Sequence, residues 1–245
     1  MMSATLAQTT QMVAPVVPVI PAMITSSANA MTAAGQPTTN SIFIDQNGDA
    51  PTVNMSQVGA GNQAGSAPSP VYLRGAGQSI ITVQQGNNNV ISNLQVINDA
   101  SGTNVGASVV IRQVGNSNTV DALCGDITMG CNKANINWMF TGNSNTMYFR
   151  GMGQGLISQV NVGGNGNAFN VAMSGAGQTQ LIDVAGNNNT FNLSQTSTGA
   201  VGSSMVINQT GTGTTYNVQQ SGTIDSVLNI HSVANGGSFN ILQRN

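Results

Sequence analysis

The stretch VNMSQVGAGNQAG, Val53–Gly65, contains the unit from which the fold can be predicted. Apolar Val53 and Met55 alternate with polar residues up to Gln57, and a glycine and an asparagine follow at positions 59 and 62. Alternation with a period of two is typical of a strand with one buried face. Gly and Asn tolerate the positive φ that a tight turn needs. The stretch therefore predicts a strand, a turn and the start of a second strand.

The same turn recurs every 22 to 29 residues along the chain, and a repeated period of this length is typical of repeat architectures. The turns are Gly59 to Asn62, Gly86 to Asn89, Gly115 to Asn118, Gly142 to Asn145, Gly164 to Asn167, Gly186 to Asn189 and Gly211 to Thr214. A degenerate eighth turn follows at 234–237, and a partial copy precedes the series at 41–51.

Apolar residues alternate with polar ones on both sides of these turns, for example at Ile136 and Trp138 before one turn and at Phe191 and Leu193 after another. Each repeat is therefore predicted to be a strand–turn–strand unit, here called a rung, with both strands facing inward. A single rung cannot bury its own apolar face, but rungs stacked about 4.8 Å apart can. We predict an all-β fold, a β-solenoid of about eight rungs over 41–245.

The register makes specific predictions about burial. Phe191 and Ile207 should lie in the core, and Thr198 and Gly199 in an exposed loop between rungs. Trp138 and Phe140 occupy inward strand positions and are expected to pack in the core.

Glutamines recur at two positions of the repeat. Gln57, Gln84, Gln113 and Gln209 stand two residues before the turn glycine, and Gln95, Gln195, Gln220 and Gln243 stand six after the asparagine position. Strand parity places them all inward. Buried amides are unfavourable unless they are hydrogen-bonded, and identical amides stacked between rungs can satisfy one another as ladders.

At these residues the sequence resembles the curlin repeat of bacterial curli amyloid subunits, S-x5-Q-x-G-x-x-N-x-A-x3-Q. VNMSQVGAGNQA matches its first half at Gln57, Gly59, Asn62 and Ala64, and QQGNNNVISNLQ keeps Gly86, Asn89 and Gln95. The resemblance covers roughly 41–245. It implies a cross-β subunit that assembles with copies of itself into an extracellular, cell-surface fibre for adhesion or biofilm matrix. It also implies a nucleator subunit and an export or chaperone system as partners.

The chain departs from that family at the position after the turn asparagine, where the family has a small residue. Here the equivalent residues are large: Ile91, Val120, Met147, Phe169, Phe191, Tyr216 and Phe239. The sequence therefore predicts a wider core than the family's. Phe140, Val162 and Val184 stand where the first glutamine of the repeat is expected.

Composition bears on the function classes. Only 5% of the 245 residues are charged, the net charge is −2 and no basic cluster is present, so nucleic-acid binding is not expected. The seven acidic residues, all aspartates, are scattered. We therefore expect no enzyme activity, and no catalytic, cofactor or metal site.

Cys124 and Cys131 enclose GDITMG between two rungs, without the further ligands that a zinc tetrad needs. A local disulfide is expected if the protein reaches an oxidising compartment, and two free thiols are the alternative.

Residues 1–40 precede the repeats. The apolar run MVAPVVPVIPAM is too short and too proline-rich to span a bilayer, so no transmembrane segment is expected. The segment is either a signal-like sequence, with ANA at 28–30 as a cleavage site, or a flexible arm.

Two functions remain open from the sequence. The first is the fibre subunit, and the alternative is a capped β-solenoid shaft or binding module of a phage or surface adhesin. Uncovered terminal rungs favour the fibre, because unpaired strand edges template the addition of further chains. Covered terminal rungs favour the shaft.

Overall fold

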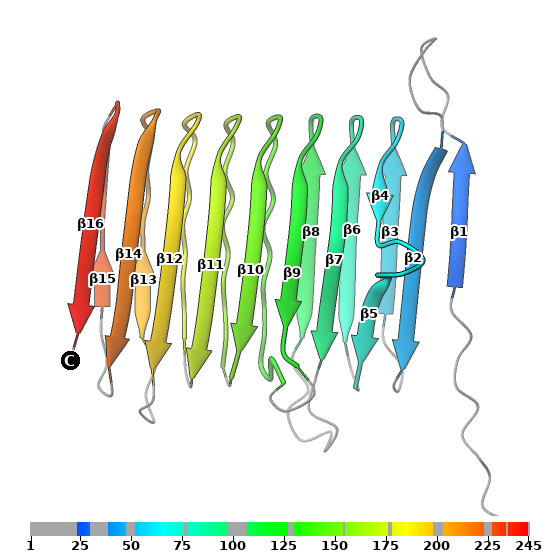
Figure 1. The fold of residues 1–245 in the computed structure, drawn as a ribbon, viewed down its shortest axis with the longest axis horizontal. Helices are drawn as coiled ribbons and strands as arrows, with labels where there is room; N and C mark the ends of the chain where they lie inside the picture. The colour runs from blue at the N-terminus through cyan, green and yellow to red at the C-terminus, as the bar shows by residue number, and fades with distance from the viewer. Residues whose placement is uncertain are drawn as a thin grey trace, which may run out of the picture.

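The computed structural model describes residues 24–29, 39–47, 52–75, 78–97, 107–126, 130–153, 155–175, 178–197, 203–222, 227–233 and 235–244. These residues form no helix, and parallel strands stack side by side into a β-solenoid of about seven turns (Figure 1). The predicted fold class is confirmed. None of the described residues forms a helix able to span a bilayer.

One sheet, here called sheet A, carries the strands on the C-terminal side of the turns. Its members in spatial order are β2 (Thr39–Asn47), β4 (Gln63–Ala64) with β5 (Val71–Arg74), β7 (Val90–Ile97), β9 (Thr119–Cys124), β10 (Thr146–Met152), β11 (Ala168–Gly175), β12 (Thr190–Ser197), β14 (Thr214–Gly222) and β16 (Gly237–Arg244). All these neighbours pair in parallel. Equivalent residues of successive rungs therefore lie in columns, as a solenoid requires.

The strands that precede the turns lie behind sheet A. They are β3 (Thr52–Val58), β6 (Ser79–Gln85) and β8 (Ser108–Val114) in one sheet, here called sheet B, and β13 (Ser204–Val206) with β15 (Val227–Asn229) further along. The turns gather along one side of the stack (Figure 1). Sheets A and B thus face each other across the core.

The middle rungs differ from the prediction, because their pre-turn segments at 134–141, 156–163 and 178–185 are not regular strands. Positive φ at residues such as Asn137, Gln159 and Asp183 rotates the peptide planes out of the ladder. Bonds between rungs persist at intervals, as from Ile157 N to Gln178 O at 3.2 Å. The inward alternation survives the loss of regular strand.

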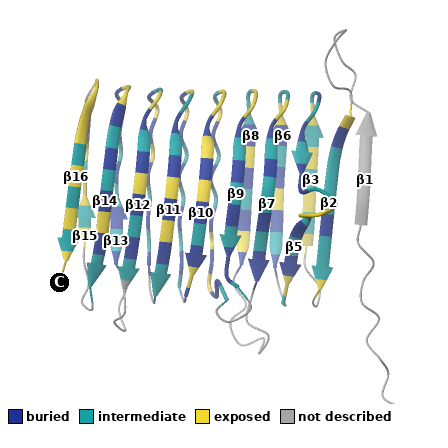
Figure 2. Cartoon of the chain, in the orientation of Figure 1, coloured by how far each residue is buried: buried dark blue, intermediate teal, exposed yellow. Residues whose placement is uncertain are grey.

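The core lies between the two layers, and buried residues alternate with exposed ones along the strands (Figure 2). Phe191 and Ile207 are fully buried, as predicted, whereas Thr198 and Gly199 lie outside the described residues. Trp138 and Phe140 are also buried, with their rings in the core.

An antiparallel strand, β1 (Ile24–Asn29), lies at the N-terminal end of the stack and pairs with β2 (Figure 1). It falls within the segment 1–40, for which the sequence predicts a signal-like sequence or an arm. β2 itself begins at Thr39, just before the predicted start of the repeats.

Candidate functional site: the ladders and the ends of the stack

The turn glycines are required by the close approach of successive rungs. Gly86 has φ +103°, and a Cβ added to it would lie 2.0 Å from Gly115 O. Gly59, Gly142 and Gly164 meet the next turn's carbonyl in the same way. Any side chain here would push the turns apart, which explains the recurrence of Gly at this position.

The turn asparagines form a buried ladder along the stack. Asn145 Nδ2 donates to Asn118 Oδ1 at 3.1 Å and to Gly164 O at 2.8 Å, and Asn145 Oδ1 accepts from Asn167 N at 3.0 Å. The equivalent bonds link Asn62, Asn89, Asn118, Asn145, Asn167 and Asn189. Because each amide is satisfied by its neighbours, burying it costs little.

The buried asparagine ladder extends further at the N-terminal end of the stack than the sequence indicates, and it stops at the C-terminal end. Asn40 continues it, since Asn62 N donates to Asn40 Oδ1 at 2.9 Å. Sequence reasoning missed this residue, although Asn40 precedes Ile42 by two positions as Asn89 precedes Ile91. At the C-terminal end, Thr214 replaces the asparagine, and Gly237 then leaves the position without a side chain.

A second, exposed asparagine ladder was not predicted. Asn116 N donates to Asn143 Oδ1 at 2.7 Å, and Asn143 N donates to Asn165 Oδ1 at 2.8 Å. Asn87 and Asn187 take the same position in their turns. The signal was present in the sequence, because the residue after the turn glycine is repeatedly Asn.

Most of the predicted inward glutamines are buried: Gln84, Gln113, Gln195, Gln209 and Gln220, with Gln57 and Gln243 half-buried. One direct amide pair runs from Gln57 Nε2 to Gln84 Oε1 at 2.7 Å. The other bonds of these residues run mainly to main-chain carbonyls, as from Gln84 Nε2 to Gln63 O and Asn89 O. These bonds tie the two layers together, both within a rung and between neighbouring rungs.

The prediction for Gln95 is wrong. The pairing of β7 with β9 shifts register between Ile91 and Asn93, and the extra residue reverses the parity of the rest of β7. Leu94 and Val96 are consequently buried, and Gln95 between them lies on the outer face of the strand.

The large residues after the turn build an aromatic stack in the C-terminal half. Phe169, Phe191, Tyr216 and Phe239 follow one another with ring centroids 4.9, 4.8 and 5.1 Å apart and nearly parallel planes. Offset stacking adds about 0.5–1.5 kcal/mol per pair beyond burial. The stack ends at Phe239, whose outer face has no ring partner among the described residues.

The half-buried apolar residues of the core are found at its two ends. Those packed against the buried core are Ile42, Val53 and Met55 at the N-terminal end and Leu228, Ile230 and Phe239 at the C-terminal end. In the part of the chain that the structure describes, no strand pairs with the outer edges of β3, β15 or β16. The edge of β2 is covered by β1.

Cys124 and Cys131 form a disulfide, with both residues fully buried. Cys124 ends β9, and Cys131 N donates to Ile97 O at 3.0 Å. The bond therefore joins the end of one rung to the segment that leads into the next.

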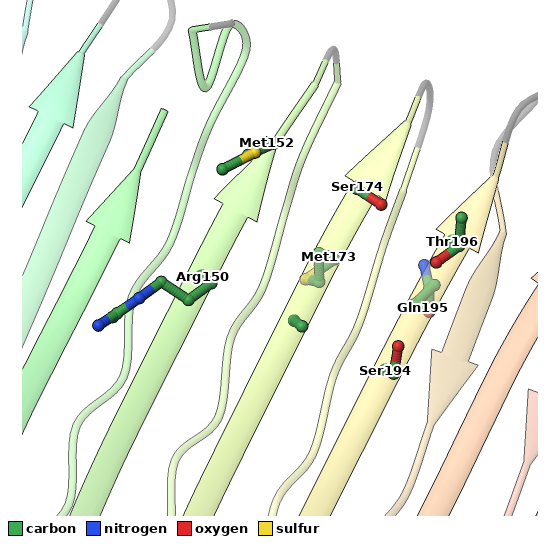
Figure 3. Close-up of a pocket in the computed structure, with 8 residues that line it drawn as sticks. Arg150, Met152, Met173, Ser174, Ser194, Gln195 and Thr196 are labelled. Carbon is green, nitrogen blue, oxygen red and sulfur yellow. The ribbon is translucent and has the colours of Figure 1, made fainter. Parts of the chain in front are cut away.

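A hollow of about 140 Å³ lies over β10, β11 and β12, lined by Arg150, Met152, Ala172, Met173, Ser174, Ser194, Gln195 and Thr196 (Figure 3). Beside it, Arg150 pairs with Asp121 at 3.0 Å, and its guanidinium lies 3.8 Å from the centre of the Tyr148 ring. The cation is already engaged by these partners, and the lining supplies no nucleophile with an adjacent base. In the described ranges, no three His, Cys, Asp or Glu residues are grouped as metal ligands would be.

Comparisons give no relative. No family model, curated protein or solved structure matches the chain.

Proposed function

We propose that this protein is a structural subunit that stacks end to end into an extracellular, amyloid-like fibre for adhesion or biofilm matrix. The observation that carries the proposal is the location of the half-buried core residues at the two ends of the solenoid. Each end presents apolar side chains and strand edges of the kind that template addition of another chain.

The two ends are different surfaces of one molecule, so their contact would be head to tail. A head-to-tail contact that does not close into a ring continues as a filament. Charge opposes this little, because only 5% of the residues are charged. The resemblance to the curlin repeat, the regular asparagine ladder and the parallel stacking support the same function. No catalytic step is part of it.

We place the fibre outside the cell because a disulfide such as Cys124–Cys131 persists in oxidising compartments. The resemblance to curli subunits supports a nucleator and an export or chaperone system as further partners. The principal partner is a second copy of this chain.

A capped shaft or binding module of a phage or adhesin is the second candidate, and β1 is the observation that favours it. β1 covers the edge of β2 at the N-terminal end, as a cap would. On this alternative, the protein stays monomeric and uses its outer face for binding.

The two candidates are separated by diluting the full chain from denaturant and examining it by electron microscopy, with and without preformed fibres. The fibre function predicts unbranched fibres, and a lag that seeds shorten. Phe239→Asp should prevent growth because it places a charge at the half-buried end of the core. Asn240→Asp adds the same charge to an exposed position and is the matched control. A wild-type chain that stays monomeric at high concentration would overturn the proposal.

A further inference from the structure

We propose that β1 occupies, in the free subunit, the place that β16 of a second copy takes in the fibre. Each addition step then replaces an antiparallel cap with a parallel strand. This inference rests on the proposed function and adds to it a gate built from the subunit's own N-terminal strand.

The pairing of β1 is unlike any other strand pairing in the stack. Ile24–Asn29 runs antiparallel to Thr39–Ile44, whereas all the neighbours from β2 to β16 in sheet A are parallel. The next parallel rung cannot be added to β2 while β1 remains there. Among the described residues, β1 pairs with Thr39 to Ile44, and none pairs with Asp45, Gln46 or Asn47 on that side.

β1 covers only one of the two layers, so a second copy has a place to begin. β3 is an edge strand of sheet B and has no outer partner strand in the described part of the chain. Its inward residues Val53 and Met55 are half-buried. The incoming C-terminal rung can therefore contact β3 before β1 leaves β2.

The registers of the two ends match on this side. Val53 and Met55 lie six and four residues before the turn glycine Gly59, as Met205 and Ile207 do before Gly211. Met205 pairs with Leu228, so Leu228 corresponds to Val53, and Ile230, two residues further along, corresponds to Met55. Apolar side chains therefore meet apolar side chains across the junction, and both sets gain burial.

The registers also match on the side where β1 lies. Phe239 follows Gly237 by two residues, as Ile42 follows Asn40, and Gly237 and Asn40 hold the same position in the rung. Parallel pairing of β16 on β2 then places Phe239 on Ile42, Ile241 on Ile44 and Gln243 on Gln46. These contacts would bury Ile42 and Phe239, both of which are only half-buried in the free subunit.

Opposite charges meet in that register. Asp45 would lie opposite Leu242, with Arg244 two residues further along β16. Inside the stack, Asp121 lies opposite Tyr148, and Arg150, two residues further along, binds Asp121 at 3.0 Å. Arg244 and Asp45 would form a diagonal pair with the same two-residue offset across the junction, with the order of acid and base along the stack reversed. The buried asparagine ladder does not continue across the junction, because Gly237 has no side chain to bond with Asn40.

A disulfide that locks β1 to β2 tests the gate in the full chain. Ser27 lies opposite Ser41. Ser41 N is directed at Asn62 O on the other side of β2, so Ser27 and Ser41 are a non-hydrogen-bonded pair. The Cα atoms of such a pair are about 4.5 Å apart, within the range for a disulfide. The variant is Ser27→Cys with Ser41→Cys, compared oxidised and reduced, with wild-type protein under both conditions as the control.

The oxidised variant should not elongate wild-type seeds, whereas the reduced variant should elongate them as wild type does. A locked subunit can still add through its own C-terminal rung, but it then presents a closed end. A small amount of it should therefore stop wild-type growth at that end. If the oxidised variant elongates seeds as fast as the reduced variant does, the proposed gate is wrong and the fibre function stands. If wild-type protein forms no fibres, the fibre function itself fails.

Hydrogen exchange of wild-type protein gives a second measurement that needs no variant. The alternate amides of 24–29 that face β2 should be protected in the monomer and should exchange rapidly in fibres. Protection of 24–29 that persists in the fibre would overturn the proposal.

Discussion

Replacing Asn145 by alanine should destabilise the stack strongly. The substitution removes the bonds of Asn145 Nδ2 to Asn118 Oδ1 and Gly164 O, and those that Asn145 Oδ1 accepts from Asn167 N and Nδ2. Asn118 Oδ1 and Asn167 Nδ2 keep other partners. Asn167 N–H and Gly164 O lose theirs, and a buried unsatisfied group costs about 1–3 kcal/mol, so the expected loss is about 2–6 kcal/mol.

Asn143→Ala is the matched control, because it makes the same change two residues away in the exposed ladder. Asn143 Oδ1 accepts from Asn116 N at 2.7 Å, but water can replace it at that exposed position, so the expected loss is below about 1 kcal/mol. Both values can be measured by urea unfolding of freshly refolded monomer. The fluorescence of Trp138, the single and fully buried tryptophan, reports on the same rung. Equal losses for the two variants would refute the argument that the buried ladder holds the rungs together.

Three further predictions concern burial, ionisation and the disulfide. Ile207→Asp should prevent folding because it puts an unpaired charge in the core, whereas Ile81→Asp, at a position 44% exposed, should leave circular dichroism unchanged. Burial raises the pKa of Tyr216, whose hydroxyl donates to Gln209 Oε1, above its ordinary value. The stability that the protonated Tyr216 hydroxyl contributes is therefore complete below about pH 10 and is lost as pH rises through the folded-state pKa. Unfolding curves of Tyr216→Phe at alkaline pH should lack this loss. Mass spectrometry of unreduced protein should find Cys124 and Cys131 lighter together by about two hydrogens, and full alkylation without reductant would contradict the disulfide.

The sequence was sufficient to predict the rungs because their determinants are local and repeated. Gly86 and Asn89 recur at fixed positions, and the alternation around them defines the inward face on each side of the turn. Large residues such as Phe191 after the turn predicted a wide core, and the structure stacks their rings there. Each of these predictions depends on a neighbour in the same rung or the equivalent residue in the next.

The features that the sequence did not reveal depend on events without a local signature. One extra residue near Ile91 reversed the parity of β7 and turned Gln95 outward. Positive φ at residues other than glycine, such as Asn137, removed the regular strand from the middle rungs without changing the apolar pattern. The pairing of β1 with β2 joins segments whose sequences carry no turn of the repeated type.

Mass per unit length of the fibres, measured together with their diffraction, tests end-to-end stacking most directly. Sheet A passes through β2, β4 with β5, β7, β9, β10, β11, β12, β14 and β16, so a subunit should advance the fibre by about nine spacings of about 4.8 Å, roughly 43 Å. One 24.9 kDa chain per roughly 43 Å corresponds to about 0.58 kDa per Å for a single filament, with a meridional reflection at about 4.7–4.8 Å. A chain that remains monomeric at every concentration, or fibres without that reflection, would contradict the account.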